Sequence, residues 1–287
     1  MAENTSNQAS KKQKRHNPWK QQNVFVKSRR FIDSGESGIF VTCERGRESK
    51  ALSELIDLLS QDLEARTPAA EDVDDSAASE DEDIEAQIKK EVEGMKPAAR
   101  PKAPFQPIKF DKIMCLSFVK TRKDIDPVEV VHRLCADAQA NPGKKRSRWI
   151  QRLTPVSLTR KHLGDGVEEL AREVLKPHFH TGSPPKKYAI RPTIRNNTEW
   201  HKDSIIKLVA SVVGPRHSVD LKNYDALILV DVLQNICGMS VVGPDYEELK
   251  RYNLAEIYNP TPKPSTSHEP PKGADVDPKP TEPSPAE

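Results

Sequence analysis

The sequence predicts an α/β (α+β) protein with two small domains. Short apolar runs typical of strands alternate with segments whose apolar residues recur every three or four positions, the pattern of amphipathic helices. These patterned segments fall into two groups, one on each side of about residue 156. The chain has 287 residues, of which 35% are hydrophobic and 31% are charged, and several long stretches are too polar to bury a core. The folded part is therefore expected to be smaller than the whole chain.

The first domain is predicted over residues 31–155, in the order strand, helix, hairpin, helix, strand. GIFVTC at 38–43 is a short apolar run, and a helix stripe follows it, formed by Leu52, Leu55, Ile56, Leu59 and Leu63. FQPIKF and KIMCLSFVKT predict a hairpin. Asp126 is expected to cap a second helix that has Pro127 at its first position. This order of elements is that of a ferredoxin-like unit.

The last strand of this domain lies within residues 144–155, KKRSRWIQRLTP, and alternates with a period of two. Trp149, Gln151 and Leu153 are expected on one face. Arg148, Ile150 and Arg152 are expected on the other face, which would present the two arginines to a partner.

The second domain is predicted over residues 156–245. A helix within GVEELAREVLKPHFH is expected to stop at Pro177, and a second helix to end at Gly214. KKYAIRPTI, HSVDL, ALILVDVLQ and CGMSVV predict strands. ALILV is apolar without alternation, so this strand is expected to be buried on both faces. Residues 246–260 predict a helical extension.

Three segments are expected to lie outside these domains. Residues 1–30 hold eight Lys or Arg and one acid, and predict a disordered tail that is either simply solvated or a nuclear or RNA-binding arm. Residues 67–103 predict a flexible acidic insertion; it is either a linker or a segment that folds back on the basic surface. Residues 261–287 contain eight prolines and predict an extended tail.

The sequence offers no recognisable catalytic site. It has neither G-x-x-x-x-G-K-[ST] nor G-x-G-x-x-G, the usual phosphate-binding loops. His178 and His180 are interpreted as a helix-end packing motif, Asp220 and Asp225 as turn residues, and Cys237 as a buried thiol. We therefore expect no catalytic residue, no cofactor and no metal.

No signal peptide and no long apolar segment is recognisable, so we expect a soluble intracellular protein whose four cysteines stay reduced.

Positive charge is concentrated in one segment that otherwise has the pattern of a folded domain. Residues 141–202 hold fourteen Lys or Arg and five acids, a net charge of +9, which favours a polyanion as partner. Trp149 and Trp200 are either stacking platforms for unpaired bases or core residues. The predicted RNA-binding residues are Lys144, Lys145, Arg146, Arg148, Arg152, Arg160, Lys161, Lys186, Lys187, Arg191, Arg195, Asn196 and Asn197.

Several blocks in fixed order resemble a known family. GVEELAREVLKPHFH, YAIRPTIRNN, SVDLKNYDALILVDV and CGMSVV resemble the THUMP domain, an RNA-binding module of tRNA-modifying proteins. SGIFVTCERGRESKALSEL, VKTRKDIDPVEVV and KRSRWIQRLTP resemble the eukaryotic, and especially fungal, THUMP proteins required for cytidine acetylation in serine and leucine tRNAs. Family members often carry two basic residues in the turn where this chain has Arg195-Asn196-Asn197, so the phosphate contacts of that turn do not carry over directly.

The resemblance implies a ferredoxin-like domain before the THUMP domain, both gripping the acceptor-stem side of tRNA, with a separate RNA cytidine acetyltransferase as partner. It also implies location in the nucleus or nucleolus, with the cytoplasm as a further location. We expect no catalytic domain after Val242. Two alternatives remain open, namely a stand-alone RNA-modifying enzyme with an unrecognised site and a scaffold that binds protein alone.

Overall fold

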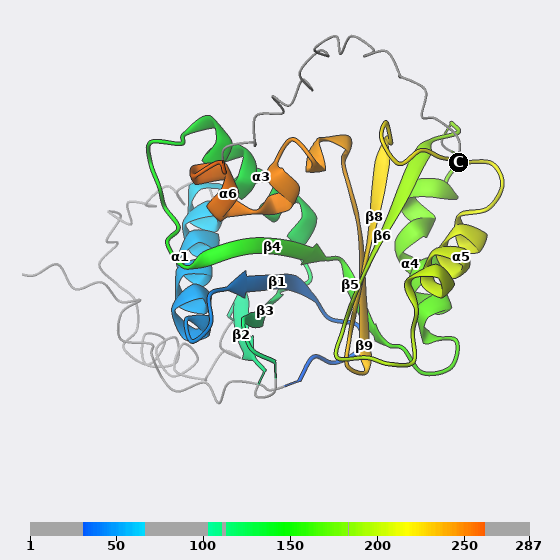
Figure 1. Ribbon diagram of the computed structural model, residues 1–287, viewed down its shortest axis with the longest axis horizontal. Helices are drawn as coiled ribbons and strands as arrows, with labels where there is room; N and C mark the ends of the chain where they lie inside the picture. The colour runs from blue at the N-terminus through cyan, green and yellow to red at the C-terminus, as the bar shows by residue number, and fades with distance from the viewer. Residues whose placement is uncertain (1–30, 67–102, 111–112, 183, 262–287) are drawn as a thin grey trace, which may run out of the picture.

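The computed structural model describes residues 31–66, 103–110, 113–182 and 184–261. The predicted basic tail, and nearly all of the predicted acidic insertion and proline-rich tail, lie outside these residues. The described chain forms two β-sheets with helices on their outer faces (Figure 1), which confirms the mixed α/β class. None of its helices is both long enough and apolar enough to cross a membrane.

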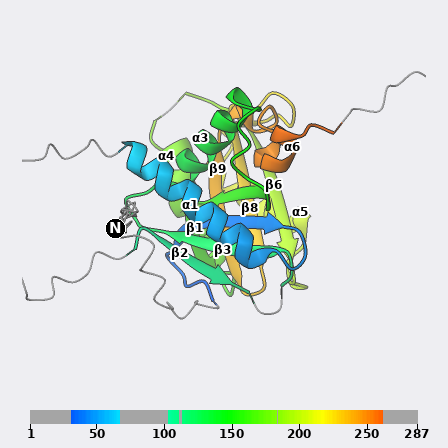
Figure 2. The same ribbon diagram turned by 90° about the vertical axis from the view of Figure 1, so that its left-hand side faces the viewer.

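The first sheet and its helices form what we call the N-terminal unit. Its elements are β1 (Ser37–Cys43), α1 (Glu48–Arg66), β2 (Phe105–Lys109), β3 (Leu116–Thr121), α3 (Pro127–Ala140) and β4 (Ile150–Val156). The antiparallel strands lie in the order β2-β3-β1-β4, and α1 lies across one face of the sheet (Figure 2). The predicted hairpin is β2-β3. As expected, the Asp126 side chain accepts a hydrogen bond from the backbone N–H of Val128.

A β-bulge interrupts the alternation of β4. Val41 pairs with Leu153 and Cys43 with Ile150, so β4 contains one residue more than β1 over this stretch. The Thr42 hydroxyl bridges the bulge, since its oxygen accepts from the N–H of Arg152 at 3.0 Å and lies 3.3 Å from the Arg152 carbonyl. Ile150 and Leu153 are consequently both buried, with 2% and 0% of their surface exposed. The prediction that they occupy opposite faces is wrong.

The second sheet and its helices form the C-terminal unit. Its elements are β5 (Leu158–Lys161), α4 (Gly166–Phe179), β6 (Lys187–Arg195), α5 (Lys202–Val213), β7 (Ser218–Val219), β8 (Ala226–Leu233) and β9 (Ile236–Val242). The strand order is β5-β9-β8-β6-β7, with β6 parallel to its two neighbours. Helices α4 and α5 cover one face, and the N-terminal unit covers part of the other (Figure 1).

Helix α4 does not stop at Pro177 as predicted; it ends at Phe179. Pro177 lacks an N–H, which costs one backbone hydrogen bond, but the helix closes its last turn with a bond from the N–H of His180 to the carbonyl of Lys176. A proline this close to the end therefore weakens the helix without ending it.

Strand β8 is buried on both faces, as its unbroken apolar run predicted. Leu227 and Leu229 belong to a core shared with the N-terminal unit, whereas Ile228 and Val230 pack with α4 and α5. Alternate side chains of one strand thus join two separate cores, which requires apolar residues at every position.

The segment after β9 returns to the N-terminal unit. It contains η2 (Pro244–Tyr246), η3 (Lys250–Tyr252) and α6 (Leu254–Tyr258), and α6 contacts both β4 and α3. Tyr252 is fully buried there and meets Tyr246 edge to face, with ring centroids 4.9 Å apart. This extension therefore completes the core of the N-terminal unit instead of projecting from the second sheet.

Candidate nucleic-acid interface

The predicted RNA-binding residues do not form one continuous patch. Arg160 and Lys161 lie on the edge strand β5, which β9 and β8 separate from β6, the strand that carries Lys187, Arg191 and Arg195. Arg160 points toward α4, where its guanidinium meets two carboxylates. Lys187 and Arg195 lie at opposite ends of β6, which at the usual strand rise separates them by about 26 Å. These residues therefore do not form a single local contact point.

Four of the predicted cations already have carboxylate partners within the chain. The shortest N–O distances are 2.9 Å for Arg146–Asp137, 2.7 Å for Arg160–Glu169, 3.2 Å for Lys187–Asp220 and 2.6 Å for Arg191–Glu247. Exposed ion pairs of this kind are worth about 0–1 kcal/mol, so phosphate can displace them. They nevertheless lower the positive charge that these side chains offer.

Other predicted residues have mainly structural contacts. Asn197 builds a turn, because its side-chain oxygen accepts from the N–H groups of Glu199 and Trp200 while its amide donates to the Gln234 carbonyl. Asn196 beside it is exposed and has a left-handed backbone, with φ of 51°. Lys186 donates to the carbonyl of His178. An RNA contact by the Asn197 amide would have to replace these bonds.

The two tryptophans that the sequence analysis singled out differ in their surroundings. Trp200 is half-buried against the core of the C-terminal unit, and its indole N–H donates to His162 at 3.3 Å. This set of contacts favours the core interpretation of Trp200. Trp149 is also half-buried, but it lies at the outer end of β4 among cations.

Three cations surround the Trp149 ring, an arrangement we call the Trp149 cluster. The charged groups of Arg47, Lys50 and Arg148 lie 4.6, 5.1 and 4.7 Å from the ring centroid. None of the three forms an ion pair within the described part of the chain. The ring attracts cations through its quadrupole and so gathers positive charge at one place.

Sequence reasoning missed Arg47 and Lys50 because they flank the start of α1, far along the chain from Trp149. A basic pair at a helix start carries no signal of its own. Only the pairing of β1 with β4 brings α1 next to the residues before β4.

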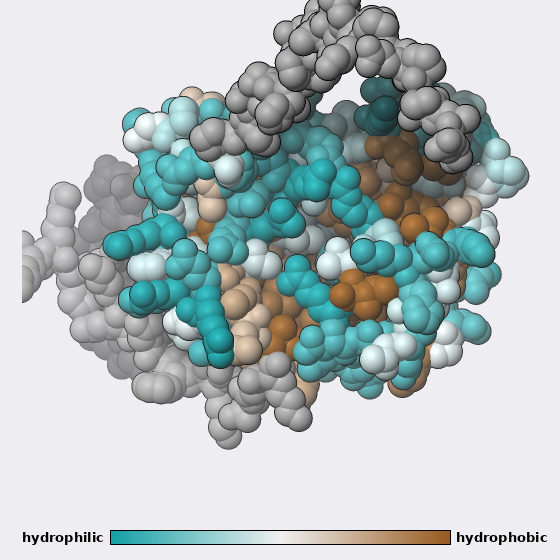
Figure 3. Space-filling view, viewed as in Figure 1, coloured by the Kyte–Doolittle hydropathy of each residue, from teal (hydrophilic) through white to brown (hydrophobic). Residues whose placement is uncertain are grey.

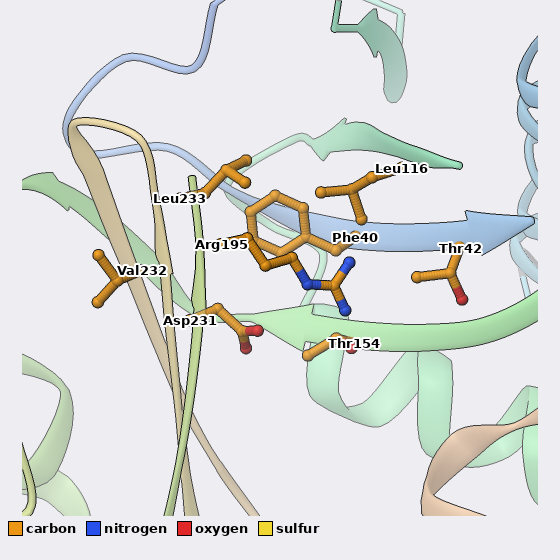
Figure 4. A pocket seen from close by; sticks show the side chains of 8 residues that line it. All are labelled: Phe40, Thr42, Leu116, Thr154, Arg195, Asp231, Val232 and Leu233. Carbon is orange, nitrogen blue, oxygen red and sulfur yellow. The ribbon is translucent and has the colours of Figure 1, made fainter. Parts of the chain in front are cut away.

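A groove that we call the junction groove lies where the two units meet, lined by Phe40, Thr42, Leu116, Thr154, Arg195, Asp231, Val232 and Leu233. Figure 4 shows Arg195 extending from β6 past Phe40 toward Thr42 and Thr154 of the first sheet. Arg152 precedes Thr154 by two residues on β4. Within the described residues, the guanidiniums of Arg152 and Arg195 form neither an ion pair nor a hydrogen bond. The Nε of Arg152 is buried and has no hydrogen-bond partner.

The junction groove also contains a carboxylate, Asp231 of β8. Burial raises its pKa to about 6, although the nearby positive charge of Arg195 and a hydrogen bond with Thr193 act in the opposite direction. Asp231 is therefore a carboxylate whose charged form burial disfavours, and Arg195 is the nearby positive charge that favours it.

The candidate catalytic groups of the sequence are used structurally. Burial raises the pKa of the Cys237 thiol to about 12 and that of Cys43 to about 11, which disfavours a thiolate nucleophile at either position. The Asp220 carboxylate accepts from the N–H groups of Lys222 and Asn223, as the turn interpretation predicted. Within the described ranges, no three His, Cys, Asp or Glu residues are placed to hold a metal ion.

Hydrophilic side chains cover most of the face that contains β4, and apolar patches appear in the middle of the view, where the two sheets meet (Figure 3). The Trp149 cluster lies at the N-terminal end of β4, and the junction groove lies near its C-terminal end, at Thr154. The unpaired cations therefore lie toward both ends of β4, with Arg152 on that strand and Arg195 contributed by β6.

The chain is similar to proteins of one family. Residues 165–242 match the THUMP domain. An uncharacterized protein of Schizosaccharomyces pombe is 39% identical over 82% of this chain and 80% of that protein. The tRNA acetyltransferase TAN1 of Saccharomyces cerevisiae is 35% identical over 82% of this chain and 89% of its own length. THUMP domain-containing protein 1 of Bos taurus is 30% identical over 79% of this chain and 65% of its own length.

Proposed function

Because the chain belongs to the family of THUMP-domain proteins that includes TAN1 of Saccharomyces cerevisiae, we propose that it binds tRNA and presents it to a separate RNA cytidine acetyltransferase. The similarity to a protein named for tRNA acetylation, which extends along most of both chains, is the observation that carries this proposal. The N-terminal unit is inferred to be a ferredoxin-like domain, since its order of elements and its strand order 2-3-1-4 fit that unit.

The unpaired cations support the RNA-binding part of the proposal. Arg47, Lys50 and Arg148 gather around Trp149, Arg152 lies farther along on β4, and Arg195 lies at the end of β6. Cations without carboxylate partners retain their full attraction for phosphate, and they release condensed counterions when they bind it. Such a surface positions RNA but does not by itself activate an acetyl donor.

The non-catalytic role is supported by the chemistry of the ionisable groups. Acetyl transfer from a thioester needs a donor site and a general base with a suitable pKa. The buried thiols have strongly raised pKa values, and the Asp220 carboxylate serves a turn. Asp231, with a pKa of about 6, is a group that a stand-alone enzyme could use as a base.

The family resemblance further suggests serine and leucine tRNAs as ligands and the nucleus or nucleolus as location. One experiment tests the ligand, the partner and the tRNA set together. Recovery of the full-length chain from cell extract, followed by identification of bound RNA and protein, should yield serine and leucine tRNAs and an RNA cytidine acetyltransferase. Recovery of the acetyltransferase without any enriched tRNA would instead support a protein-only scaffold, and an even mixture of all tRNAs would refute the selectivity.

A further inference from the structure

Arg195 lines the junction groove, and Arg152 lies on β4 two residues before the lining residue Thr154; neither guanidinium is paired within the described residues. On β4, Arg152 and Thr154 share the face opposite the buried Leu153. On β6, Arg191 and Arg195 share the face of Ala189, which packs into the core of the N-terminal unit. The two strands therefore present their polar side chains to the same space, and Figure 4 shows Arg195 and Thr154 within it.

Buried hydrogen-bond donors without partners lie on the two strands that border the groove, β4 and β6. The Arg152 Nε and the Arg191 Nη1 are both buried and lack partners among the described residues, although the other terminal nitrogen of Arg191 donates to Glu247 at 2.6 Å. Buried donors without acceptors are rare in folded proteins, and they mark positions where water or a ligand supplies the acceptor. Because these donors are guanidiniums, the complementary ligand is an anion.

The shape of the groove limits which anion it can take. Its enclosed part measures about 10 Å³, room for one water molecule but not for a nucleotide base. A ligand must therefore lie across the mouth, where Arg195 and the hydroxyls of Thr42 and Thr154 are half-exposed. Guanidinium forks match the oxygens of a phosphodiester, and the Thr154 hydroxyl can donate to the same oxygens, whereas the Thr42 hydroxyl is engaged with the Arg152 backbone.

We propose that the junction groove is a phosphate-binding site built by both units, in which Arg152 and Arg195 hold one stretch of the RNA backbone. The proposal rests on the proposed function, because it takes tRNA as the source of the phosphates. Asp231 is a competing anion in the same groove, so it weakens the hold of Arg195 on phosphate. RNA bound here contacts both units at once.

The test compares full-length variants in titrations of labelled tRNA at several salt concentrations. R152Q and R195Q should each weaken binding by about tenfold or more and lower the salt slope by about 0.7–0.9. R195K keeps the charge but loses the forked guanidinium, so its affinity for tRNA should lie between that of R195Q and that of the unsubstituted chain. D231N removes the competing anion and should tighten binding, a change in the opposite direction that damage to the fold would not produce.

R172Q is the matched control. Arg172 lies on α4, on the far side of the second sheet, and pairs with Glu168. Its substitution removes the same charge and should change affinity by less than about twofold.

The outcomes separate this inference from the proposed function. If the unsubstituted chain binds tRNA while R152Q, R195Q and D231N all behave like R172Q, the groove is not a phosphate site and the proposed function stands. If the unsubstituted chain does not bind tRNA, both proposals fall. If R152Q or R195Q unfolds, R195K and D231N decide the same question, because they keep the size and shape of the side chains.

Discussion

At the scale of single residues, the chemistry at the junction depends on how well each charge is compensated. Arg191 has Glu247 as a partner, whereas Arg195 lies near Asp231, whose charge burial disfavours. Arg160 has two carboxylates, while Arg148 has an aromatic ring and no acid. Residues that look alike in the sequence thus differ in how freely they can bind phosphate.

The raised pKa of Asp231 makes a prediction about stability. The folded state binds the Asp231 proton more tightly than the unfolded chain does, so this group costs stability as pH rises through about 6. Above that pH, the charged Asp231 lowers the free energy of unfolding by about 1–3 kcal/mol. The upper figure converts the whole rise in its pKa, from 3.8 to about 6, into free energy. D231N should therefore raise the free energy of unfolding at pH 8 and have little effect near pH 4. Equal effects at the two pH values, measured by urea denaturation, would contradict this account.

A second residue-scale prediction concerns the cations of β4. Reversal of Arg148 and Arg152 to Glu removes charge from both the Trp149 cluster and the junction groove. Binding of tRNA should weaken, and its salt slope should fall by roughly 0.9 for each phosphate that the variant no longer neutralises. The control is the same reversal at Arg172, on the far face of the second sheet. An unchanged slope in a folded R148E/R152E variant would remove this face from the RNA interface.

At the scale of elements, the periodicity of the sequence predicted which segments are helices and strands but not how they pair. The alternation of β4 breaks at a bulge that depends on β1, and Thr42 stabilises it from the partner strand. No local pattern in residues 144–155 shows this. By contrast, ALILV correctly predicted a strand buried on both faces, because such a strand needs an apolar residue at every position.

The candidate site was less predictable than the fold. The sequence indicates how many cations a segment holds, but the carboxylates that neutralise Arg160 and Arg191 come from elsewhere in the chain. Arg47 and Lys50 reach Trp149 only through tertiary packing. The sequence indicated that β4 and β6 carry positive charge. Only the structure shows which of these cations have carboxylate partners and which do not.

The C-terminal segment supplies an element-scale prediction. Tyr252 is fully buried in the core of the N-terminal unit, and its hydroxyl has no hydrogen-bond partner among the described residues. Y252A should lower the free energy of unfolding by about 3–5 kcal/mol, the range for removal of a buried aromatic side chain. Y252F retains the ring and removes a buried unsatisfied hydroxyl, so it should be neutral or stabilising. A small effect of Y252A in thermal or urea unfolding would show that this segment is not part of the core.

At the scale of the whole molecule, one core joins the two units. It contains Ile39 and Leu55 of the N-terminal unit, Leu229 of β8, and Tyr252 of the returning segment. Because this packing fixes the two sheets against each other, cations on β4 and β6 keep a constant spacing. A rigid basic surface can hold a large RNA in one orientation, which is what presentation to a second protein requires.

The most direct test of the adaptor role is a reconstituted acetylation reaction with purified components. The chain alone, with tRNA and acetyl-CoA, should form no acetylcytidine, because a positive surface positions the substrate without activating the thioester. The RNA cytidine acetyltransferase together with the chain should acetylate those tRNAs that the chain binds. Acetylcytidine formed by the chain alone would make it an enzyme, and an equal rate for the acetyltransferase without the chain would contradict the adaptor role.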